Sequence, residues 1–373
     1  MGRTLVASPS PPPEFFKAQR MIGGLASGLG AAFFQSLSFL GNRYFAHSRG
    51  AQASRQLLVL AHIWMGIFSA VLLAIMWPGG AGWEWIWKVR EPLLQMTFFY
   101  LIGQMGITLA LRHAEPSRVS PLMGLKTIFL AGLSTFLPQP QLTQASQAVG
   151  LTGLQWAGVG LSLVAAIALN YAGTKLRKHA IWAILLACTS FAFADWNIAR
   201  TNVALKAVLP GLSTVAISFL NVGLCYFLAG VVGWAAAPWY GSRKGRDWAD
   251  AVPFAAAWFA GMLCLYWCYA EVGPLLGVIL QSTRGLMSIL MGSLLVYWGH
   301  LHLEPINSRK VFIRRFAAGA LMCLSVTLYV IGDPKYDIMG KWHLTLEGPR
   351  WKASRNMIAG MSYSAHATCA KSA

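Results

Sequence analysis

Residues 116–137 read PSRVSPLMGLKTIFLAGLSTFL, a stretch apolar enough to cross a lipid bilayer although it carries Lys126 near its centre. At about 1.5 Å of rise per helical residue, Lys126 lies about 15 Å from the start of such a helix, near the middle of a hydrocarbon core about 30 Å thick. A charge at that depth is costly unless it is paired or hydrated. Lys126 is therefore a candidate functional residue.

A second apolar stretch carries a cation at a similar depth. Residues 273–299 read GPLLGVILQSTRGLMSILMGSLLVYWG, with Arg284 inside. Three pairs of landmarks are separated by nearly the same offset: Glu115 and Glu271 (156 positions), Arg43 and Arg200 (157 positions), and Lys126 and Arg284 (158 positions). The common offset predicts an internal repeat.

The composition is that of a polytopic membrane protein. Of the 373 residues, 56% are hydrophobic and only 11% are charged, and the mean hydropathy is +0.52. Globular domains carry about twice that share of charged residues. The net charge of +18 comes mostly from Lys and Arg between apolar stretches, where they face lipid head groups rather than nucleic acid. We therefore expect a multi-pass protein of the plasma or inner membrane, in contact with the lipid bilayer, and no nucleic-acid partner.

The sequence contains no pattern typical of a disulfide framework, a metal site or an ATP-binding loop. Five of the six cysteines lie inside apolar stretches, and their spacing fits neither a disulfide framework nor a metal site. No GxxxxGK[ST] run is present to hold the phosphates of ATP. We expect no cofactor, no metal and no enzymatic activity. The polar N-terminal segment has no apolar region typical of a cleaved signal peptide.

The fold class predicted is an all-α integral membrane protein with ten transmembrane helices in two inverted five-helix repeats. The ten predicted spans are residues 21–41, 56–77, 92–112, 116–137, 153–173, 180–199, 212–237, 251–270, 273–299 and 312–332. Residues 21–173 form the first repeat and 174–332 the second, between a polar N-terminal segment (1–20) and a polar, basic C-terminal tail (333–373). An odd number of spans per repeat inverts the second half, and secondary transporters of this kind bind substrate between their halves.

Ten spans in two halves resemble the drug/metabolite transporter superfamily, in particular its EamA-like ten-helix members. The resemblance rests on ALRHAEPSRVSPLMGLKTIFLAGLS at 110–134 and CYAEVGPLLGVILQSTRGLMSILMGSLLVYWGHLHLEPIN at 268–307. Glu304 matches the acid of the family's turn after the ninth helix, whereas the first half has FLPQPQLTQ and no acid. The resemblance implies transport of small metabolites by export or exchange, and Lys126 and Arg284 are placed as in the phosphate-translocator branch.

The orientation of the chain in the membrane stays open. Counting Lys and Arg in the loops predicts that both termini lie outside the cytoplasm, because the loops after odd-numbered spans are the more basic. The resemblance implies the opposite, with both termini in the cytoplasm.

Lys126 and Arg284 are the central candidates for substrate binding, because one buried cation from each half would favour an anion between them. Arg284 is suited to bidentate anion binding, and Gln281 and Thr283 on the same predicted helix are further donors. Asp195 is the alternative, internal partner of Lys126 and also a candidate proton carrier. Three uncharged residues are candidate cavity liners or interhelical hydrogen-bond partners: Gln35, Gln104 and Asn170.

These features predict a secondary transporter that moves small, anionic organic metabolites by alternating access, with a coupling ion such as a proton. One alternative is an exporter of amino acids or lipophilic compounds, in which the two cations are paired internally. An integral membrane enzyme acting on lipids is an alternative of another class. The substrate, the direction of transport and the oligomeric state are not specified by the sequence.

Overall fold

The computed structural model describes residues 13–49, 53–79, 82–113, 119, 122–137, 151–170, 178–242, 244–297 and 309–332. All regular elements in these ranges are helices. In chain order they are α1 (Pro13–Arg49), α2 (Ala53–Met76), α3 (Glu84–His113), η1 (Met123–Leu125), α5 (Lys126–Phe136), α6 (Gly153–Asn170), α7 (Lys178–Val208), α8 (Thr214–Tyr240), α9 (Gly245–Val272), α10 (Pro274–Ser282), α11 (Arg284–Tyr297) and α12 (Arg309–Ile331).

Six of these helices have the length and apolar composition needed to cross a membrane. They comprise Arg20–Asn42 of α1, Glu84–Leu111 of α3, and the whole of α2, α7, α8 and α9. A helix satisfies its backbone hydrogen bonds within its own segment, as a lipid environment requires. The six helices are compatible with a multi-pass membrane protein. The other four predicted spans correspond to shorter helices and to α12.

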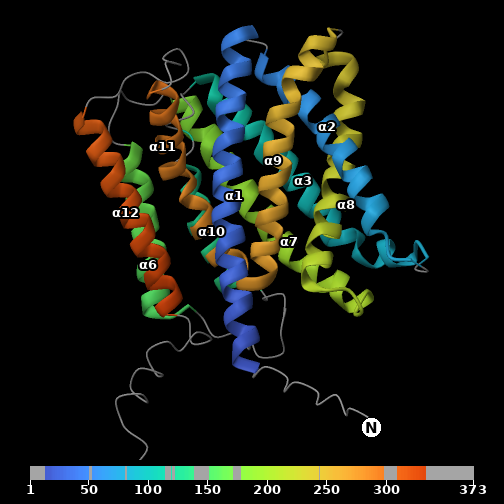
Figure 1. Cartoon of the computed structure of the whole chain (residues 1–373), viewed down its shortest axis with the longest axis horizontal. Coiled ribbons are helices and arrows are strands. Elements are labelled where there is room, and N and C mark those ends of the chain that lie inside the picture. The colour runs from blue at the N-terminus through green and yellow to red at the C-terminus, as the bar shows by residue number, and fades with distance from the viewer. Residues whose placement is uncertain are drawn as a thin grey trace, which may run out of the picture.

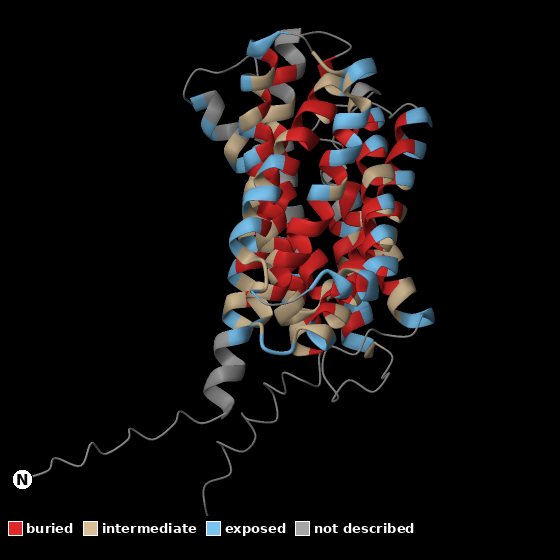
Figure 2. Ribbon diagram, turned by 90° about the vertical axis from the view of Figure 1, so that its right-hand side faces the viewer, coloured by how far each residue is buried: buried red, intermediate tan, exposed pale blue. Residues whose placement is uncertain are grey.

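The buried residues lie in the interior of the bundle (Figure 2). Many of the exposed residues are large and apolar. Ile75, Met105 and Trp182 are all well exposed, on α2, α3 and α7. The described part of the chain therefore has an apolar exterior of the kind that lipid solvates.

The helices of the two predicted halves interleave (Figure 1). The most extensive contacts join α1 to α9, α3 to α7, α2 to α8 and α6 to α12. Each pair takes one helix from each half, so neither half packs chiefly on itself. The buried interior is consequently built by both halves together.

Glycines allow several of these helix pairs to approach closely. A Cβ on Gly66 of α2 would lie 2.8 Å from the Cα of Gly230 on α8, and one on Gly106 of α3 would lie 3.0 Å from the carbonyl oxygen of Ala183 on α7. Without a hydrophobic driving force between helices in lipid, such small residues permit close packing. Gly160 of α6 is different, because a Cβ there would meet no atom within 4 Å.

The helical turn is tightened locally at each of the two buried cations, while the backbone keeps helical dihedral angles at Lys126 and Thr283. The Lys126 backbone N–H bonds to the Met123 carbonyl at the junction of η1 and α5, and the Thr283 N–H bonds to the Leu280 carbonyl between α10 and α11. These bonds between residues three apart tighten the helical turn. The Thr283 hydroxyl also donates to Leu280 (2.7 Å), a side-chain bond that competes with regular helix geometry.

Several helix boundaries also differ from the prediction. α1 begins at Pro13, inside the stretch predicted to be a polar N-terminal segment, and α3 begins at Glu84 rather than at 92. Pro suits the first turn of a helix, where its missing N–H has no partner to lose, whereas Pro92 lies inside α3. Glu115, Glu304, residues 1–12 and the predicted tail from 333 lie outside the described residues.

Replacing Gly66 by Ala should lower the free energy of unfolding by about 1–3 kcal/mol, because the added methyl group forces α2 away from the α8 backbone. Thermal unfolding of the purified protein measures the effect. Gly160→Ala is the matched control, since its Cβ enters open space, and it should be neutral or slightly stabilising. Equal behaviour of the two variants would contradict the close α2–α8 approach.

Candidate functional site

Helices α5 and α11 bring both buried cations into the interior of the bundle. Lys126 begins α5 and Arg284 begins α11, and each side chain is only 4% exposed. Asp195, in the middle of α7, is 2% exposed. Such groups rarely occur at these exposures without partners, so their contacts decide what the site can bind.

Lys126 and Asp195 form an ion pair. The distance from Lys126 Nζ to Asp195 Oδ2 is 2.7 Å, and the pair joins α5 of the first half to α7 of the second. The sequence left open whether Lys126 pairs internally or with a substrate, and in this structure its partner is internal. A buried pair of this kind is strongly destabilised if one member is removed.

Among the described residues, the side chain of Arg284 bonds to an amide, Gln35, rather than to a carboxylate. Its Nη1 donates to Gln35 Oε1 on α1 (3.2 Å), and Gln281 Nε2 donates to the same oxygen (2.7 Å). Gln35 donates in turn to Met262 Sδ on α9 (3.3 Å). Three sequence-predicted residues, Gln35, Gln281 and Arg284, therefore form one buried hydrogen-bonded group.

The guanidinium of Arg284 retains free hydrogen-bonding capacity. Its Nε is buried and has no partner among the described residues. The Phe39 ring lies 5.5 Å from the guanidinium carbon, which stabilises the cation through the face of the ring. Neither the hydrogen bond to Gln35 nor the contact with the Phe39 ring neutralises the positive charge of the guanidinium.

The two groups form one electrostatic cluster. Lys126 and Arg284 are close enough to repel each other, and Arg284 is also attracted to Asp195. With two cations and one carboxylate, this central cluster of Lys126, Asp195, Arg284, Gln35 and Gln281 carries a formal charge of +1. In a medium of low dielectric constant, an uncompensated charge favours binding of an anion.

Two residues that contact the central cluster are missing from the sequence prediction. Phe39 lies against Arg284, and the Ser36 hydroxyl donates to the Arg284 carbonyl oxygen (2.9 Å). Tyr269 is a third buried residue missed, and its hydroxyl has no hydrogen-bond partner among the described residues. Ser36 follows Gln35 directly, but its role depends on which face of α1 meets α11. No sequence signal marks Phe39 or Tyr269, because aromatic residues are frequent throughout the chain.

The remaining predicted site residues lie elsewhere or are otherwise engaged. The Thr283 hydroxyl is bonded to its own helix at Leu280. Gln104 on α3 lines two cavities whose walls do not include the central cations. Asn170 ends α6, and its side chain lies outside the described part of the chain.

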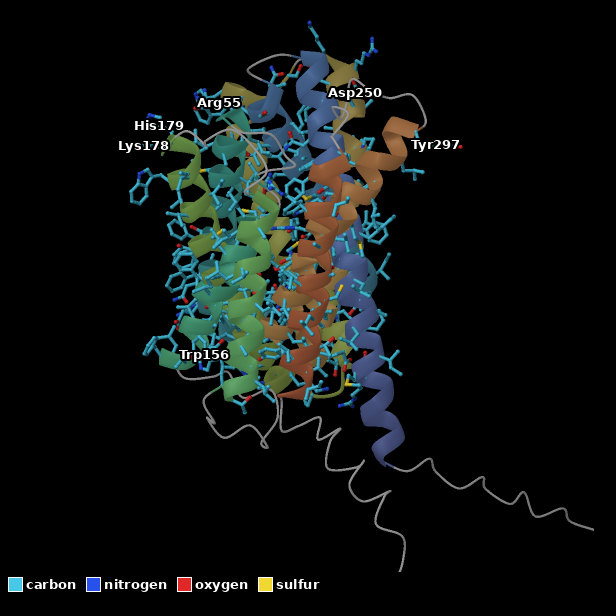
Figure 3. The ribbon with its side chains drawn as sticks, turned by 90° about the vertical axis from the view of Figure 1, so that its left-hand side faces the viewer. Arg55, Trp156, Lys178, His179, Asp250 and Tyr297 are labelled. Carbon is cyan, nitrogen blue, oxygen red and sulfur yellow. The ribbon has the colours of Figure 1, made fainter. Side chains whose placement is uncertain are left out.

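The two cavities differ in size and position. The smaller, about 10 Å³, has room for about one water and lies among α1, α2, α3 and α9, with Phe39 and Gln104 in its wall. The larger, about 470 Å³, lies between α2, α3 and α8. Arg55, at its rim, is at the same end of the bundle as Lys178 and His179 (Figure 3). Their walls do not include Lys126, Asp195 or Arg284, which are closed off from solvent here.

No protein-family model and no curated protein matches this chain. A solved structure described as "Crystal structure of protein" is similar over 81% of this chain and 96% of that chain, at 16% sequence identity and a TM-score of 0.49. A likeness at this level carries no argument about fold or activity.

Replacing Asp195 by Asn should lower the free energy of unfolding by about 3–5 kcal/mol, because it leaves the Lys126 ammonium buried without a counter-charge. Lys126→Met should have a similar cost for the same reason. The double variant should lose less than the sum of the two, since it leaves no unpaired charge.

Thermal unfolding of the wild type and the three variants measures this coupling. Glu91→Gln is the control, because it breaks the more exposed Glu91–Arg200 pair and should change stability by no more than about 1 kcal/mol. Strictly additive losses at Lys126 and Asp195 would show that the two charges do not stabilise each other.

Proposed function

We propose that the protein is a secondary transporter of small organic anions, with the central cluster as its substrate site. The observation that carries the proposal is the charge of that cluster, in which two buried cations share one carboxylate. An anion bound beside Arg284 would satisfy the free Nε and neutralise the remaining positive charge. The closed arrangement around the cations corresponds to an occluded state of an alternating-access cycle.

An inverted repeat is part of this proposal, and reciprocal contacts support it. With the 157-residue offset, Gly66 corresponds to Gly223 and Leu73 to Gly230. Gly66 meets Gly230, and Gly223 meets Leu73, so the contact occurs twice with the two halves exchanged. The same exchange of halves converts the α1–α9 pair into the α3–α7 pair. It converts the α2–α8 pair and the α6–α12 pair each into itself. Reciprocity of this kind is typical of a two-fold relation between two similar units.

We further propose ten spans, with the η1–α5 pair and the α10–α11 pair as corresponding ones. Substrate sites of secondary transporters lie near the midplane of the membrane, where the two halves meet. Here the tightened turns occur at Lys126 and at Thr283, 157 positions apart, at or beside the two cations. This correspondence connects the architecture to the proposed site.

Asp195 is the one described carboxylate in the cluster and thus the candidate acceptor of a coupling proton. Protonation of Asp195 would release the Lys126 ammonium to an anionic substrate, and deprotonation would restore the internal pair. Proton binding and substrate binding would then be linked at one ion pair.

An amino-acid exporter is the second candidate, and it is favoured by the presence of both charge signs in the cluster. Asp195 would receive the ammonium group of the amino acid and Arg284 its carboxylate. Thermal stabilisation of the purified protein by a library of organic acids, phosphorylated metabolites and amino acids distinguishes the two, because a ligand of the native state raises its apparent stability.

Arg284→Ala and Lys126→Ala should abolish uptake of the identified anion into proteoliposomes, because each removes a cation from the cluster. Arg284→Lys keeps the charge but loses the planar fork, so substrate affinity should fall about tenfold or more. Initial uptake rates over a range of substrate concentrations give both quantities.

Arg246→Ala is the matched control, since Arg246 is well exposed at the start of α9 and should not affect uptake. Circular dichroism and size-exclusion profiles establish that each variant is folded. Normal uptake by folded Arg284→Ala and Lys126→Ala proteins would refute the anion site.

A further inference from the structure

The larger cavity has an apolar wall that is open to the surroundings of the bundle. It measures about 470 Å³, within the range of about 300–1,000 Å³ typical of small-molecule sites. Its wall includes Met105, Leu186 and Val232, which are 64%, 48% and 48% exposed. On helices of membrane-spanning length, such side chains face lipid. We call this cavity the lateral pocket.

The inner wall of the lateral pocket holds two buried polar groups without partners. His62 on α2 and Gln104 on α3 are each 4% exposed and both line the pocket. His62 Nε2 and Gln104 Nε2, which is near the Tyr100 hydroxyl, have no hydrogen-bond partner among the described residues. Leaving two polar groups unsatisfied beside an apolar cavity is unfavourable and calls for a ligand.

The hydrogen-bonding roles of these two groups are complementary. His62 Nδ1 lies 2.6 Å from the carbonyl oxygen of Leu58, which only accepts, so Nδ1 carries the proton. The other nitrogen of the neutral ring, Nε2, is therefore an acceptor. Gln104 Nε2 is a donor. A ligand that satisfies both must donate one hydrogen bond and accept one.

We propose that the lateral pocket binds a long-chain fatty acid from the bilayer, with its carboxyl group at His62 and Gln104. The carboxylic O–H donates to His62 Nε2, and the carboxylic C=O accepts from Gln104 Nε2. The chain lies along the apolar wall of Met105, Leu186 and Val232.

The charge at the rim of the pocket favours the same class of ligand. Arg55 lies one helical turn before Leu58 and about 10 Å along α2 from His62, at the end of the bundle that also carries Lys178 and His179 (Figure 3). A cation at the head-group level attracts the ionised form of a fatty acid, which takes up a proton from water before its O–H donates to His62 inside the pocket. Lipid solvates the hydrocarbon chain of the fatty acid about as well as the pocket does. The carboxyl group is therefore what makes the pocket select a fatty acid over other lipids with similar chains.

This proposal is independent of transport by the central cluster. Lys126, Asp195 and Arg284 are not part of the lateral pocket, so substitutions there leave the carboxyl contacts in place. Fatty-acid binding therefore succeeds or fails separately from the proposed anion transport.

The test uses the full chain in nanodiscs and a photoactivatable hexadecanoic acid with a diazirine near the end of its chain. Crosslinked residues are identified by mass spectrometry, and unlabelled hexadecanoic acid, hexadecanol and methyl hexadecanoate compete with the probe. The expected result is crosslinking at the pocket wall, with the acid competing at least about fivefold more strongly than either analogue, since the ester has no O–H and the alcohol has no carbonyl.

Four variants locate the site. Gln104→Leu removes the donor, and His62→Asn removes Nε2 while keeping an N–H for Leu58, so each should weaken binding about fivefold. Ala236→Trp fills the pocket and should abolish crosslinking there, whereas Ala235→Trp places the same side chain on an exposed position of α8 outside the pocket wall and should not.

Equal competition by the alcohol and the ester, or unchanged crosslinking in the Ala236→Trp protein, would overturn the proposal. Because Ala235→Trp carries the same bulk at the neighbouring position, a general loss of folding would reduce crosslinking in both proteins and would be detected by their unfolding temperatures.

Discussion

The ion pair between Lys126 and Asp195 constrains the rest of the structure. A lysine in the interior of a bundle of apolar helices needs a counter-charge, and the carboxylate that supplies it comes from the opposite half of the chain. The pair therefore fixes the position of α5 relative to α7, and α7 in turn packs along α3. The charge of the central cluster depends on this one contact, which adds a buried ion pair to the packing between the two halves.

The central cluster and the lateral pocket illustrate two ways of placing polar groups in an apolar interior. In the central cluster Lys126 and Asp195 neutralise each other, and what remains includes a positive charge, the Nε–H of Arg284 and the amide oxygen of Gln281. In the lateral pocket the groups are neutral, and the remaining capacity is one donor and one acceptor. The first environment favours an ion and the second a neutral acid.

The sequence was sufficient to predict an all-helical, apolar chain, and to single out Lys126 and Arg284, because a charge inside an apolar stretch is detectable from composition alone. The tightened turns beside them were not predicted, since a lone glycine such as Gly124 or Gly285 is common in membrane helices and does not by itself indicate a change of helix geometry. The partners of the cations were only partly predictable. Asp195 was recognisable as a buried acid, whereas the Gln35–Arg284 contact depends on how α1 packs against α10 and α11.

Gln104 shows where reasoning from sequence is weakest. An uncharged amide within a span has several possible partners, and its position along the helix does not say which neighbour it faces. The structure places it in the lateral pocket beside His62, a residue that had no signal in the sequence because a lone histidine fits many environments. To say which neighbour such a residue faces, one must know how its helix is rotated about its own axis. The periodicity of apolar residues defines this rotation poorly when both faces of the helix are apolar.

The reciprocal contact of Gly66 with Gly230 and of Gly223 with Leu73 contrasts with the composition of the central cluster. Lys126 and Arg284 come one from each predicted half, whereas Asp195 corresponds to Ser38 at the same offset and so has no acidic counterpart. The odd charge of the central cluster therefore arises from a single position at which the two halves of the chain differ.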